Sequence, residues 1–438
     1  MGRRIRYANA ALDATGVSFG EAARFMAALM LRNFATRGWV FRADGVTSLP
    51  GCIVASPSRP DGSDVTDQDY LFFWVRDGAI CALEAAHANL PTGSLLDDHV
   101  AFCKLVSARA AAAGKTAGHA CFRIDGEVRP WSEQSDGPAM RIVSLLEMRA
   151  ALSPGARADA DALVRADLEY LLDVHGGPTT NLWEETLGRS FFARAVQLRA
   201  LRSLQPRLAE LQLLPHQARI SQACDALVAA LAAHWVPGAR RYRSVLEDGR
   251  GADLDVDVVM AAVYGDLPCT DPKLLSTAAQ LRDAFSALYP IVAKDAERGI
   301  GPVVGRYPED TYDGDLGDPT PDVGHPWPLC TCNFAELYYR VAREAGRRRK
   351  LAVEGDAVPF FRQVGIEGSG TLQGAPLAQA VGQLESAGDR MLRAVLYHSD
   401  QLELSEQFDR DSGYEKSVRN LTWSYASFLS AVRARGAI

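Results

Sequence analysis

The chain contains 438 residues, of which 47% are hydrophobic and 23% charged, a composition typical of a soluble globular protein with a large core. Its net charge of −7 at pH 7 argues against a nucleic-acid partner, because nucleic-acid-binding proteins concentrate basic residues. The sequence has neither a run of about 18 apolar residues to cross a membrane nor the apolar stretch of a signal peptide, so we predict a cytoplasmic protein without a membrane partner.

Apolar residues that recur at intervals of three and four positions predict a chain of helices. The twelve expected helices lie near residues 18–36, 76–89, 95–113, 137–152, 157–174, 189–204, 215–235, 253–264, 272–289, 329–346, 375–397 and 416–434. Alternation typical of strands is limited to short pieces such as residues 51–55 and 121–124, which suit small hairpins on a helical body. The expected fold class is therefore all-α.

The connections between these helices are of two kinds. Every second helix, beginning with the one near residue 76, follows a segment rich in Trp, Tyr, Gly, Pro, Asp and Glu, whereas the other connections are shorter and plainer. If six helical hairpins close into a ring, these rich loops meet at one end, and long loops in a compact domain are commonly functional. We therefore predict a single (α/α)6 barrel domain over residues 1–438. A helical solenoid is the alternative, but no fixed repeat supports it.

Two adjacent carboxylates, Glu184 and Glu185, follow Trp183 in the loop before the helix near residue 189. Adjacent acids repel each other and are costly to bury, so their apolar neighbours favour a raised pKa for one of them, which is typical of a functional site. The competing interpretation is that both acids begin a helix, where negative charge suits the exposed amides. This stretch by itself leaves both interpretations open.

The loop before the helix near residue 76 places Tyr70 and Trp74 ahead of an Arg-Asp pair, Arg76 and Asp77. Sugars need such a combination, because their hydroxyls require charged or bidentate hydrogen bonds and the C–H faces of the ring stack on aromatic side chains. The alternative is a structural ion pair beside core aromatics.

The next rich loop contains Trp131 and, after it, the sequence Asp136-Gly137-Pro138. This Asp-Gly-Pro signature is typical of a helix N-cap, so we expect Asp136 to be architectural. Trp131 stands outside the cap and is expected either to fill the core or to stack on a ligand.

Two further rich loops combine charged groups with rigid aromatic side chains. One contains Arg306, Asp310 and Trp327, and the other contains Glu406 ahead of Trp423. A solvated charged loop would not need so many aromatic residues as the first of these contains, so that loop favours a binding site. Glu406 follows an apolar-polar alternation that could direct it to the end of the ring where the rich loops meet, but it is one acid among 54 and by itself indicates little.

Other kinds of chemistry leave little trace in the sequence. Eight cysteines are scattered without a disulfide framework and are expected to be reduced. Cys330 and Cys332 form the one close pair, which is a weak metal signal and is better explained by buried small residues. His325 is interpreted as a turn residue, and the acidic loop of residues 247–253 suggests no chemistry. We predict neither a metal nor a cofactor.

Several catalytic motifs are absent from the sequence, namely G-x-S-x-G, the Walker lysine loop, G-x-G-x-x-G after a strand and H-E-x-x-H. The carboxylates on the aromatic-rich loops are therefore the remaining candidates for catalytic groups. Two such groups on opposite walls can hydrolyse a glycoside, because one protonates the leaving oxygen and the other activates water.

Five blocks, in this order, resemble glycoside hydrolase family fifteen, the glucoamylases, from about residue 20 to the C-terminus. The blocks are residues 53–58 with 69–77, Trp131 with 136–139, 182–192, 305–312 with 326–327, and 405–409 with 421–425. The resemblance implies an (α/α)6 barrel. It also implies an exo-acting enzyme that releases β-glucose from the non-reducing ends of α-1,4-glucans or maltooligosaccharides, with inversion of configuration.

By position within these blocks, the resemblance implies that Glu184 is the general acid and Glu406 the general base. Glu184 is then expected to stay protonated near neutral pH with the help of Glu185 and apolar neighbours, while Glu406 stays ionised. Inversion predicts that the two carboxyl groups lie roughly 6.5–9.5 Å apart. The implied substrate-binding residues are Tyr70, Trp74, Arg76, Asp77, Trp131, Trp183, Glu185, Arg306, Asp310, Trp327 and Trp423.

The chain departs from the family pattern at Asn181, where an Asp is frequent, and in the residues after Trp131, which leaves the preferred linkage open. A hydrolase of α,α-trehalose or α-1,6-linked glucans therefore stays an alternative, as does a sugar-binding ring without catalysis. A terpene cyclase, another helical toroid, lacks support because its Asp-rich metal motifs are absent. We see no β-sandwich or starch-binding domain of the kind that some family members carry.

Overall fold

The computed structural model describes residues 18–59, 68–88, 94–314 and 324–436. Within these residues the chain is mainly helical. The helices are α1 (Phe19–Leu31), α2 (Val75–His87), α3 (Leu95–Ala112), α4 (Asp136–Met148), α5 (Pro154–Val174), α6 (Phe191–Leu204), α7 (Gln217–Ala232), α8 (Asp257–Tyr264), α9 (Pro272–Leu288), α10 (Pro290–Glu297), α11 (Pro328–Arg348), α12 (Val358–Arg362), α13 (Gly374–His398) and α14 (Thr422–Arg435).

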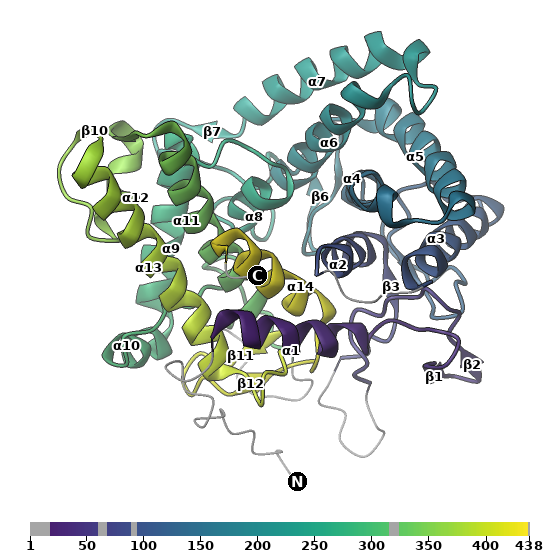
Figure 1. Cartoon of the computed structure of the whole chain (residues 1–438), viewed down its shortest axis with the longest axis horizontal. Helices are drawn as coiled ribbons and strands as arrows, with labels where there is room; N and C mark the ends of the chain where they lie inside the picture. The colour runs from purple at the N-terminus through teal and green to yellow at the C-terminus, as the bar shows by residue number, and fades with distance from the viewer. Residues whose placement is uncertain (1–17, 60–67, 89–93, 315–323, 437–438) are drawn as a thin grey trace.

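Six helices of the described residues form an inner ring (Figure 1). In order round the ring, α2 packs on α4, α4 on α6, α6 on α8, α8 on α11, and α11 on α14. The ring closes because α14 packs on α2, which joins the C-terminal part of the chain to its N-terminal part.

The other long helices lie outside this ring, and each precedes an inner helix along the chain (Figure 1). On the outside, α1 packs on α14, α5 on α4, α7 on α6, α9 on α8 and α13 on α11, while α3 packs on α5. Outer and inner helices therefore alternate in six hairpins. This arrangement is the predicted (α/α)6 barrel.

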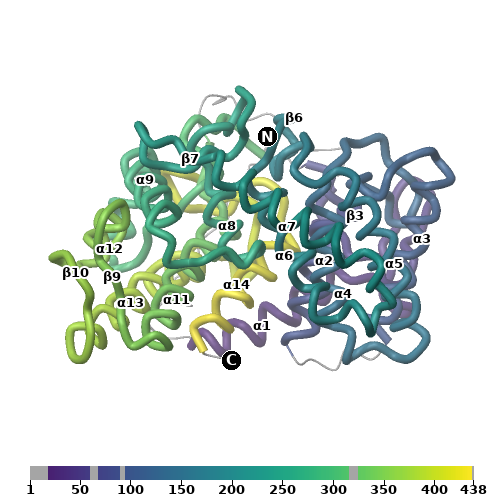
Figure 2. Tube along the Cα trace, turned by 90° about the horizontal axis from the view of Figure 1, so that it is seen from above, coloured from purple at the N-terminus to yellow at the C-terminus, as the bar shows by residue number. Residues whose placement is uncertain are grey.

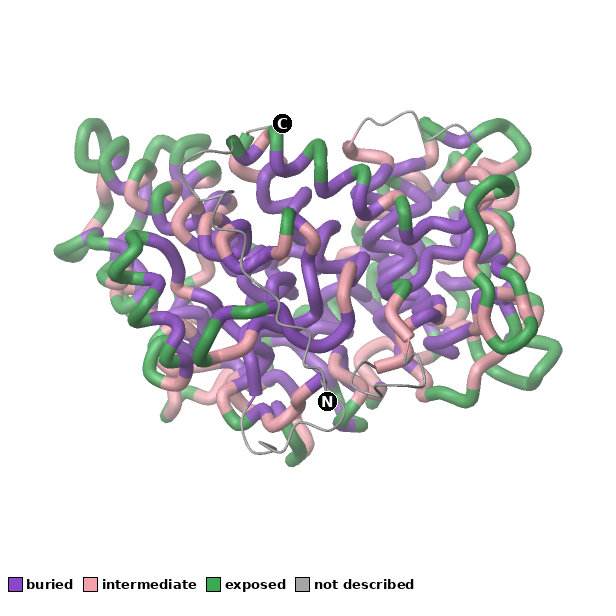
Figure 3. The backbone as a smooth tube through the Cα atoms, turned by 90° about the horizontal axis from the view of Figure 1, so that it is seen from below, coloured by how far each residue is buried: buried purple, intermediate pink, exposed green. Residues whose placement is uncertain are grey.

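The two layers differ in burial (Figure 3). Every residue of α8 is buried, and α2 is buried continuously from Val75 to Ala85, because neighbouring helices enclose the inner ring. The outer helix α13 instead buries one face, with Leu377, Ala380 and Leu384 at intervals of three and four. One cluster of buried apolar side chains extends from Phe19 to Val432 and joins both layers.

The strands of the described residues form two-stranded antiparallel pairs. The pairs are β1 (Arg42–Ala43) with β2 (Val46–Thr47), β3 (Phe73–Trp74) with β4 (Cys121–Phe122), β5 (Thr179–Thr180) with β6 (Leu187–Gly188), β7 (Trp235–Val236) with β8 (Arg241–Tyr242), β9 (Leu351–Val353) with β10 (Gly370–Leu372), and β11 (Gln407–Phe408) with β12 (Glu415–Lys416). Of the two pieces that the sequence predicted, residues 121–124 contain β4, which pairs with the distant β3 rather than with an adjacent strand in a hairpin, whereas residues 51–55 contain only an isolated bridge from Ile53 to Phe34.

All twelve expected helices are present, and the differences lie at their ends. The helix expected from residue 253 begins at Asp257, because the residues before it form a loop. The helix expected from residue 416 begins at Thr422, because Lys416 belongs to strand β12. Two short helices that contact α9, α10 and α12, were not predicted from the sequence.

The cysteines are free, and all except Cys269 are buried, including Cys330 and Cys332 as predicted. In the described part of the chain, no three His, Cys, Asp or Glu side chains are grouped as a metal site. The helices described are also too short or too polar to span a membrane. The prediction that the chain lacks an export signal concerned the first residues, and residues 1–17 lie outside those described.

Candidate active site

The predicted site residues lie where the inner helices begin, at the end that we call the mouth of the barrel. Arg76 is in the first turn of α2, Asp136 is the first residue of α4, and Trp423 is in the first turn of α14. Glu184 precedes α6, and Trp327 is the N-cap of α11. Figure 2 shows β6, just before α6, at one end of the barrel and the C-terminus, after α14, at the other. The barrel therefore gathers residues that are distant in the chain.

Glu184 and Glu185 lie in the turn between β5 and β6, and Asn181 organises this turn. The Oδ1 atom of Asn181 accepts hydrogen bonds from the backbone N–H groups of Glu185 (2.9 Å) and Thr186 (3.1 Å). An Asp carboxylate would accept the same bonds, so the departure from the family pattern preserves the turn. Since α6 begins only at Phe191, the interpretation that the two acids begin a helix is wrong.

Glu184 itself adopts a left-handed backbone conformation, with φ of 66°. This region disfavours residues other than glycine, and residues held there are concentrated at functional sites. Its Oε2 atom accepts a hydrogen bond from Nε1 of Trp131 (2.8 Å). Its Oε1 atom lies 3.9 Å from Nη2 of Arg76 and has no hydrogen-bond partner among the described residues. One carboxyl oxygen is thus fixed, and the other is available.

The environment of Glu184 favours its protonated form. Burial raises the pKa of Glu184 to about 7, although Arg76 and the hydrogen bond from Trp131 lower it. Asp77 and Asp136 raise it further by repulsion between like charges. The repulsion therefore comes from acids in the first turns of α2 and α4, and not from the adjacent Glu185 as expected.

Arg76 is buried and joins two loops. Its guanidinium lies 3.2 Å from the carboxylate of Asp77 and 3.3 Å from that of Asp136, and it donates to Oε1 of Gln134 (3.2 Å). The expected N-cap role of Asp136 is wrong, because Ser135 is the N-cap and Asp136 is the first residue of α4, where its carboxylate accepts from Arg76. A buried guanidinium needs anionic partners, and Asp136 supplies one. The ring of Trp423 faces Arg76 at 5.3 Å.

A wall of aromatic rings connects Glu184 to Glu406. The ring centroids of Trp131 and Trp74 are 5.7 Å apart, as are those of Trp74 and Tyr70, and the hydroxyls of Tyr70 and Tyr312 are 3.0 Å apart. The hydroxyl of Tyr312 in turn donates to Oε2 of Glu406 (3.0 Å). Trp131 is 36% exposed, so it does not fill the core.

Glu406 is buried beside the β11–β12 hairpin. The register of this hairpin places Ser417 opposite Glu406, and the Ser417 hydroxyl donates to the carboxylate. Burial raises the pKa of Glu406, whereas hydrogen bonds from Ser417, Tyr70 and Tyr312 lower it and offset part of the cost of burying the charge. Hydroxyl donors favour the ionised form, so this carboxylate is suited to accept a proton.

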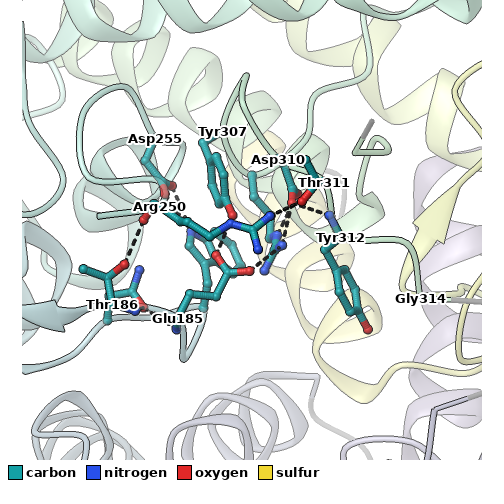
Figure 4. Close-up of polar contacts among 12 residues, drawn as sticks. Glu185, Thr186, Arg250, Asp255, Tyr307, Asp310, Thr311, Tyr312 and Gly314 are labelled. Atoms are coloured by element: carbon teal, nitrogen blue, oxygen red, sulfur yellow. Dashed lines mark hydrogen bonds and ion pairs between the residues drawn. The ribbon is translucent and has the colours of Figure 1, made fainter. Parts of the chain in front are cut away.

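Glu185 belongs to a separate set of charges (Figure 4). It accepts hydrogen bonds from Nη2 of Arg306 (3.0 Å) and from the hydroxyl of Tyr307 (2.5 Å). Arg306 also donates to both oxygens of Asp310, at 2.8 and 2.7 Å, and lies 4.9 Å from the ring of Tyr312. Two carboxylates and an aromatic face therefore compensate this buried cation, and they bring it near the aromatic wall.

Trp183 and Trp327 pack together beside Arg306, with ring centroids 5.8 Å apart. Nε1 of Trp183 donates to both oxygens of Asp255, at 3.0 and 2.8 Å. Burial and the repulsion of Asp257 raise the pKa of Asp255 well above its usual range. Asp255 thus fixes the indole of Trp183 on this side of the mouth.

The loop of residues 247–253, for which we predicted no chemistry, also belongs to the mouth. Arg250 donates to the Thr311 hydroxyl, and its carbonyl accepts a hydrogen bond from Thr186 (3.0 Å) (Figure 4). His325 lies in the irregular segment before α11, where its Nδ1 accepts from the backbone N–H of Arg410 (3.2 Å). Neither contact has a signature in the sequence.

The structure brings the predicted residues into one network and adds others that the prediction missed. Ser417 was missed because a helix was expected from residue 416, whereas the β11–β12 hairpin places this residue opposite Glu406. Tyr307 and Tyr312 lay within a recognised block, but their roles were not assigned. Asp136 and Asp255 had no usable signal, since their partners come from other loops.

This arrangement supports acid–base chemistry. One carboxyl group has a pKa near neutrality and a free oxygen, and another is buried but stabilised by hydroxyl donors. Arg-carboxylate pairs beside aromatic rings supply hydrogen bonds and flat apolar faces for a polyhydroxylated ligand.

The whole chain is similar to proteins of one family. The sequence model of that family, glycosyl hydrolases family 15, matches residues 29–433. The chain therefore belongs to this family and is a glycoside hydrolase. A probable glucoamylase of Schizosaccharomyces pombe is 27% identical and covers 89% of this chain and 86% of that relative. An intracellular sporulation-specific glucoamylase of Saccharomyces cerevisiae is 27% identical, over 88% of this chain and 79% of the relative. The solved glucoamylase of Saccharomycopsis fibuligera shares the fold, with a TM-score of 0.83, 21% identity, and coverage of 99% of this chain and 98% of that one.

Proposed function

We propose that this protein is a glucan 1,4-α-glucosidase that releases β-glucose from the non-reducing ends of maltooligosaccharides, with inversion. The observation that carries the proposal is the pairing of two unlike carboxyl groups across one aromatic wall, Glu184 with its pKa raised to about 7 and Glu406 with its hydroxyl donors. The glucoamylase relatives support the same substrate class.

In this proposal Glu184 is the general acid. Because Oε2 accepts the Trp131 N–H, the acidic proton belongs on Oε1, which is free of other hydrogen bonds. This proton passes to the glycosidic oxygen as the C1–O bond breaks, and the leaving sugar departs as an alcohol. Arg76 and Asp77 would bind the hydroxyls of the terminal glucose.

Glu406 is the proposed general base. It takes a proton from a water molecule while the water oxygen bonds to C1 from the opposite face, so the released glucose is the β-anomer. Tyr70 and Tyr312, which contact each other beside Glu406, would face the positive charge that develops on the sugar. The predicted separation of roughly 6.5–9.5 Å between the two carboxyl groups leaves room for that water.

In this proposal the leaving-group sugar binds to the charged groups around Arg306. Glu185, Arg306 and Asp310 form a rigid set of hydrogen-bonding groups, and the neighbouring Trp183 and Trp327 offer apolar faces. This side would decide between α-1,4, α-1,6 and α,α-1,1 linkages, because these linkages orient the leaving sugar differently.

We also propose that the barrel alone forms the catalytic domain and that the protein acts in the cytoplasm. The single catalytic domain is supported by the site, whose described side chains all belong to barrel helices or the loops between them. Support for the second comes from the free cysteine thiols and from the intracellular yeast relative. A fractionation assay that found the protein only outside the cell would contradict it.

The test is to compare glucose release from maltose, isomaltose and trehalose and to follow fresh digests by proton NMR. We expect maltose to be hydrolysed fastest and the β-anomer to appear first. A preference for trehalose or isomaltose would replace the proposed linkage by the alternative. The α-anomer appearing first would overturn the inverting mechanism. Binding of maltose without any hydrolysis would indicate a sugar-binding protein.

A further inference from the structure

Trp131 is an exposed side chain that nevertheless has to keep one orientation. It is 36% exposed, yet its Nε1 donates to Glu184 at 2.8 Å. One neighbour is Trp74, in an edge-to-face contact. A large, half-exposed side chain with a single edge contact would sample several rotamers, so another group must restrict it.

Arg129 provides this restriction. Its guanidinium carbon lies 4.1 Å from the ring centroid of Trp131 and 3.8 Å from that of Phe72, so the planar cation contacts two aromatic rings. Trp74 lies slightly farther away, at 5.8 Å. Such cation–aromatic contacts are attractive because the faces of the rings carry partial negative charge.

The main chain and the head group of Arg129 are both anchored. Its backbone N–H donates to the carbonyl of Cys121 (3.3 Å), and its carbonyl accepts from Nε2 of His119 (2.9 Å). Its Nη1 lies 3.7 Å from Sγ of Cys121. Cys121 belongs to β4, which pairs with β3, the strand that runs directly into α2. Arg129 is therefore attached to the strand pair that leads into α2.

Arg129 also lacks the usual partner of a guanidinium. No carboxylate among the described residues lies within ion-pair distance of it, whereas Arg76 and Arg306 at the same mouth each contact two or more. Its recorded partners are aromatic rings and a sulfur atom. Such partners are expected of an arginine that orients aromatic rings, and not of one that forms a surface salt bridge.

We infer that Arg129, with Phe72 behind it, is a positioning residue that holds the indole N–H of Trp131 on Glu184. It acts through Trp131 and does not touch the reacting atoms. The inference rests on the proposed function, because it takes Glu184 as the acid whose proton is transferred. It assigns a role to a residue outside the five blocks that carried the resemblance.

The test compares Arg129→Ala with Arg129→Lys in the full-length protein, measuring kcat and KM for maltose across pH. Arg129→Ala should lower kcat about tenfold, since Trp131 would no longer be fixed, while KM changes less. Losing the Trp131 hydrogen bond should raise the pKa of Glu184, because that bond lowers it. The basic limb of the kcat profile should therefore move to higher pH.

Arg129→Lys separates orientation from charge. Lysine keeps the positive charge but lacks the flat surface that stacks between two rings. If stacking is what matters, Arg129→Lys should move the basic limb in the same direction as Arg129→Ala. A lysine variant with the wild-type profile would overturn the inference, because charge alone would then suffice.

A double-mutant cycle with Trp131→Phe tests whether Arg129 acts through the indole. Phenylalanine has no N–H to donate, so adding Arg129→Ala to Trp131→Phe should change kcat less than twofold. A full tenfold loss in that background would show that Arg129 acts elsewhere. The matched control is Arg123→Ala, since Arg123 lies near β4 and pairs with Asp125 (3.8 Å), and it should leave kcat unchanged.

These outcomes separate the inference from the proposed function. If the wild-type protein releases no glucose from maltose, the proposed function fails. If the wild type is active and Arg129→Ala retains both its kcat and its pH profile, the proposed function stands and the inference fails.

Discussion

At the scale of single residues, the two proposed catalytic acids differ through their hydrogen bonds. Glu184 accepts one N–H and lies near two other acids. Burial raises the pKa of Glu406 as well, but hydrogen bonds from Ser417, Tyr70 and Tyr312 and the charge of Arg306 offset part of that rise. The proposed roles of these two acids differ because burial and repulsion favour the neutral form of Glu184, whereas hydroxyl donors favour the charged form of Glu406.

Removing either acid should reduce turnover without abolishing sugar binding. Glutamine keeps the shape of glutamate but cannot exchange a proton, so Glu184→Gln and Glu406→Gln should each lower kcat by about 10²–10⁴. Steady-state assays on maltose would measure the rate, and calorimetric titration would measure binding. An unaffected rate for Glu406→Gln would remove this residue from the mechanism.

The raised pKa of Glu184 also predicts how stability changes with pH. The pKa of Glu184 is about 7 in the folded protein, against 4.5 ordinarily. The stability that protonated Glu184 contributes is therefore fully present below pH 4.5 and is lost as the pH rises through 7. Glutamine does not titrate, so the free energy of unfolding of Glu184→Gln should rise by up to about 3 kcal/mol relative to that of the wild type between those pH values.

Denaturant unfolding of both proteins at pH 4.5 and pH 7.5 would measure this difference. A gap that stays constant with pH would mean that Glu184 titrates normally in the folded protein. A gap that widens toward neutral pH would identify a site that favours function over stability.

At the scale of elements, each outer helix is attached to an inner helix through apolar contacts and a few buried polar pairs. Arg141 of α4 and Asp167 of α5 form a two-bond ion pair, at 2.7 and 2.6 Å, and both are buried. The pair fixes how the second hairpin docks on its neighbour, because the fork of arginine matches a carboxylate in one orientation.

Asp167→Ala should destabilise the protein strongly, because it leaves Arg141 buried without a counter-charge. The expected loss in the free energy of unfolding is about 3–5 kcal/mol. Asp161→Ala is the control. It removes one partner of Arg149, which is 19% exposed and keeps Glu210, so a loss of at most about 1 kcal/mol is expected. Equal losses in the two variants would show that burial does not decide the effect.

At the scale of the whole molecule, the chain carries a net charge of −7, and the buried cations Arg76 and Arg306 at the mouth are each paired with carboxylates. A neutral glucan is not steered by this field. The field would, however, attract or repel a charged ligand over about one Debye length.

For maltooligosaccharides, kcat/KM should therefore change less than about twofold between 0.01 and 0.15 M salt. Stopped assays at constant pH across a salt series would measure it. A steep fall in kcat/KM with added salt would indicate that the protein attracts a charged substrate, contrary to the proposed function.

The sequence by itself determined the helices, their order, and the end of the barrel at which the rich loops meet. Helical periodicity depends on neighbours three and four positions away, so it can be detected in the sequence alone. The blocks around Glu184 and Glu406 were recognisable for a similar reason, since each is a short continuous segment.

Only the tertiary structure decided which groups surround each acid. Asp136 looked like a helix cap but pairs with Arg76, and Asp255, which was expected to lie in a helix, instead precedes α8 and accepts from Trp183. The pKa of Glu184 depends on burial and on charges in the first turns of α2 and α4. Hydrogen bonds and electrostatic interactions act through distance in space, and the closure of the ring sets those distances.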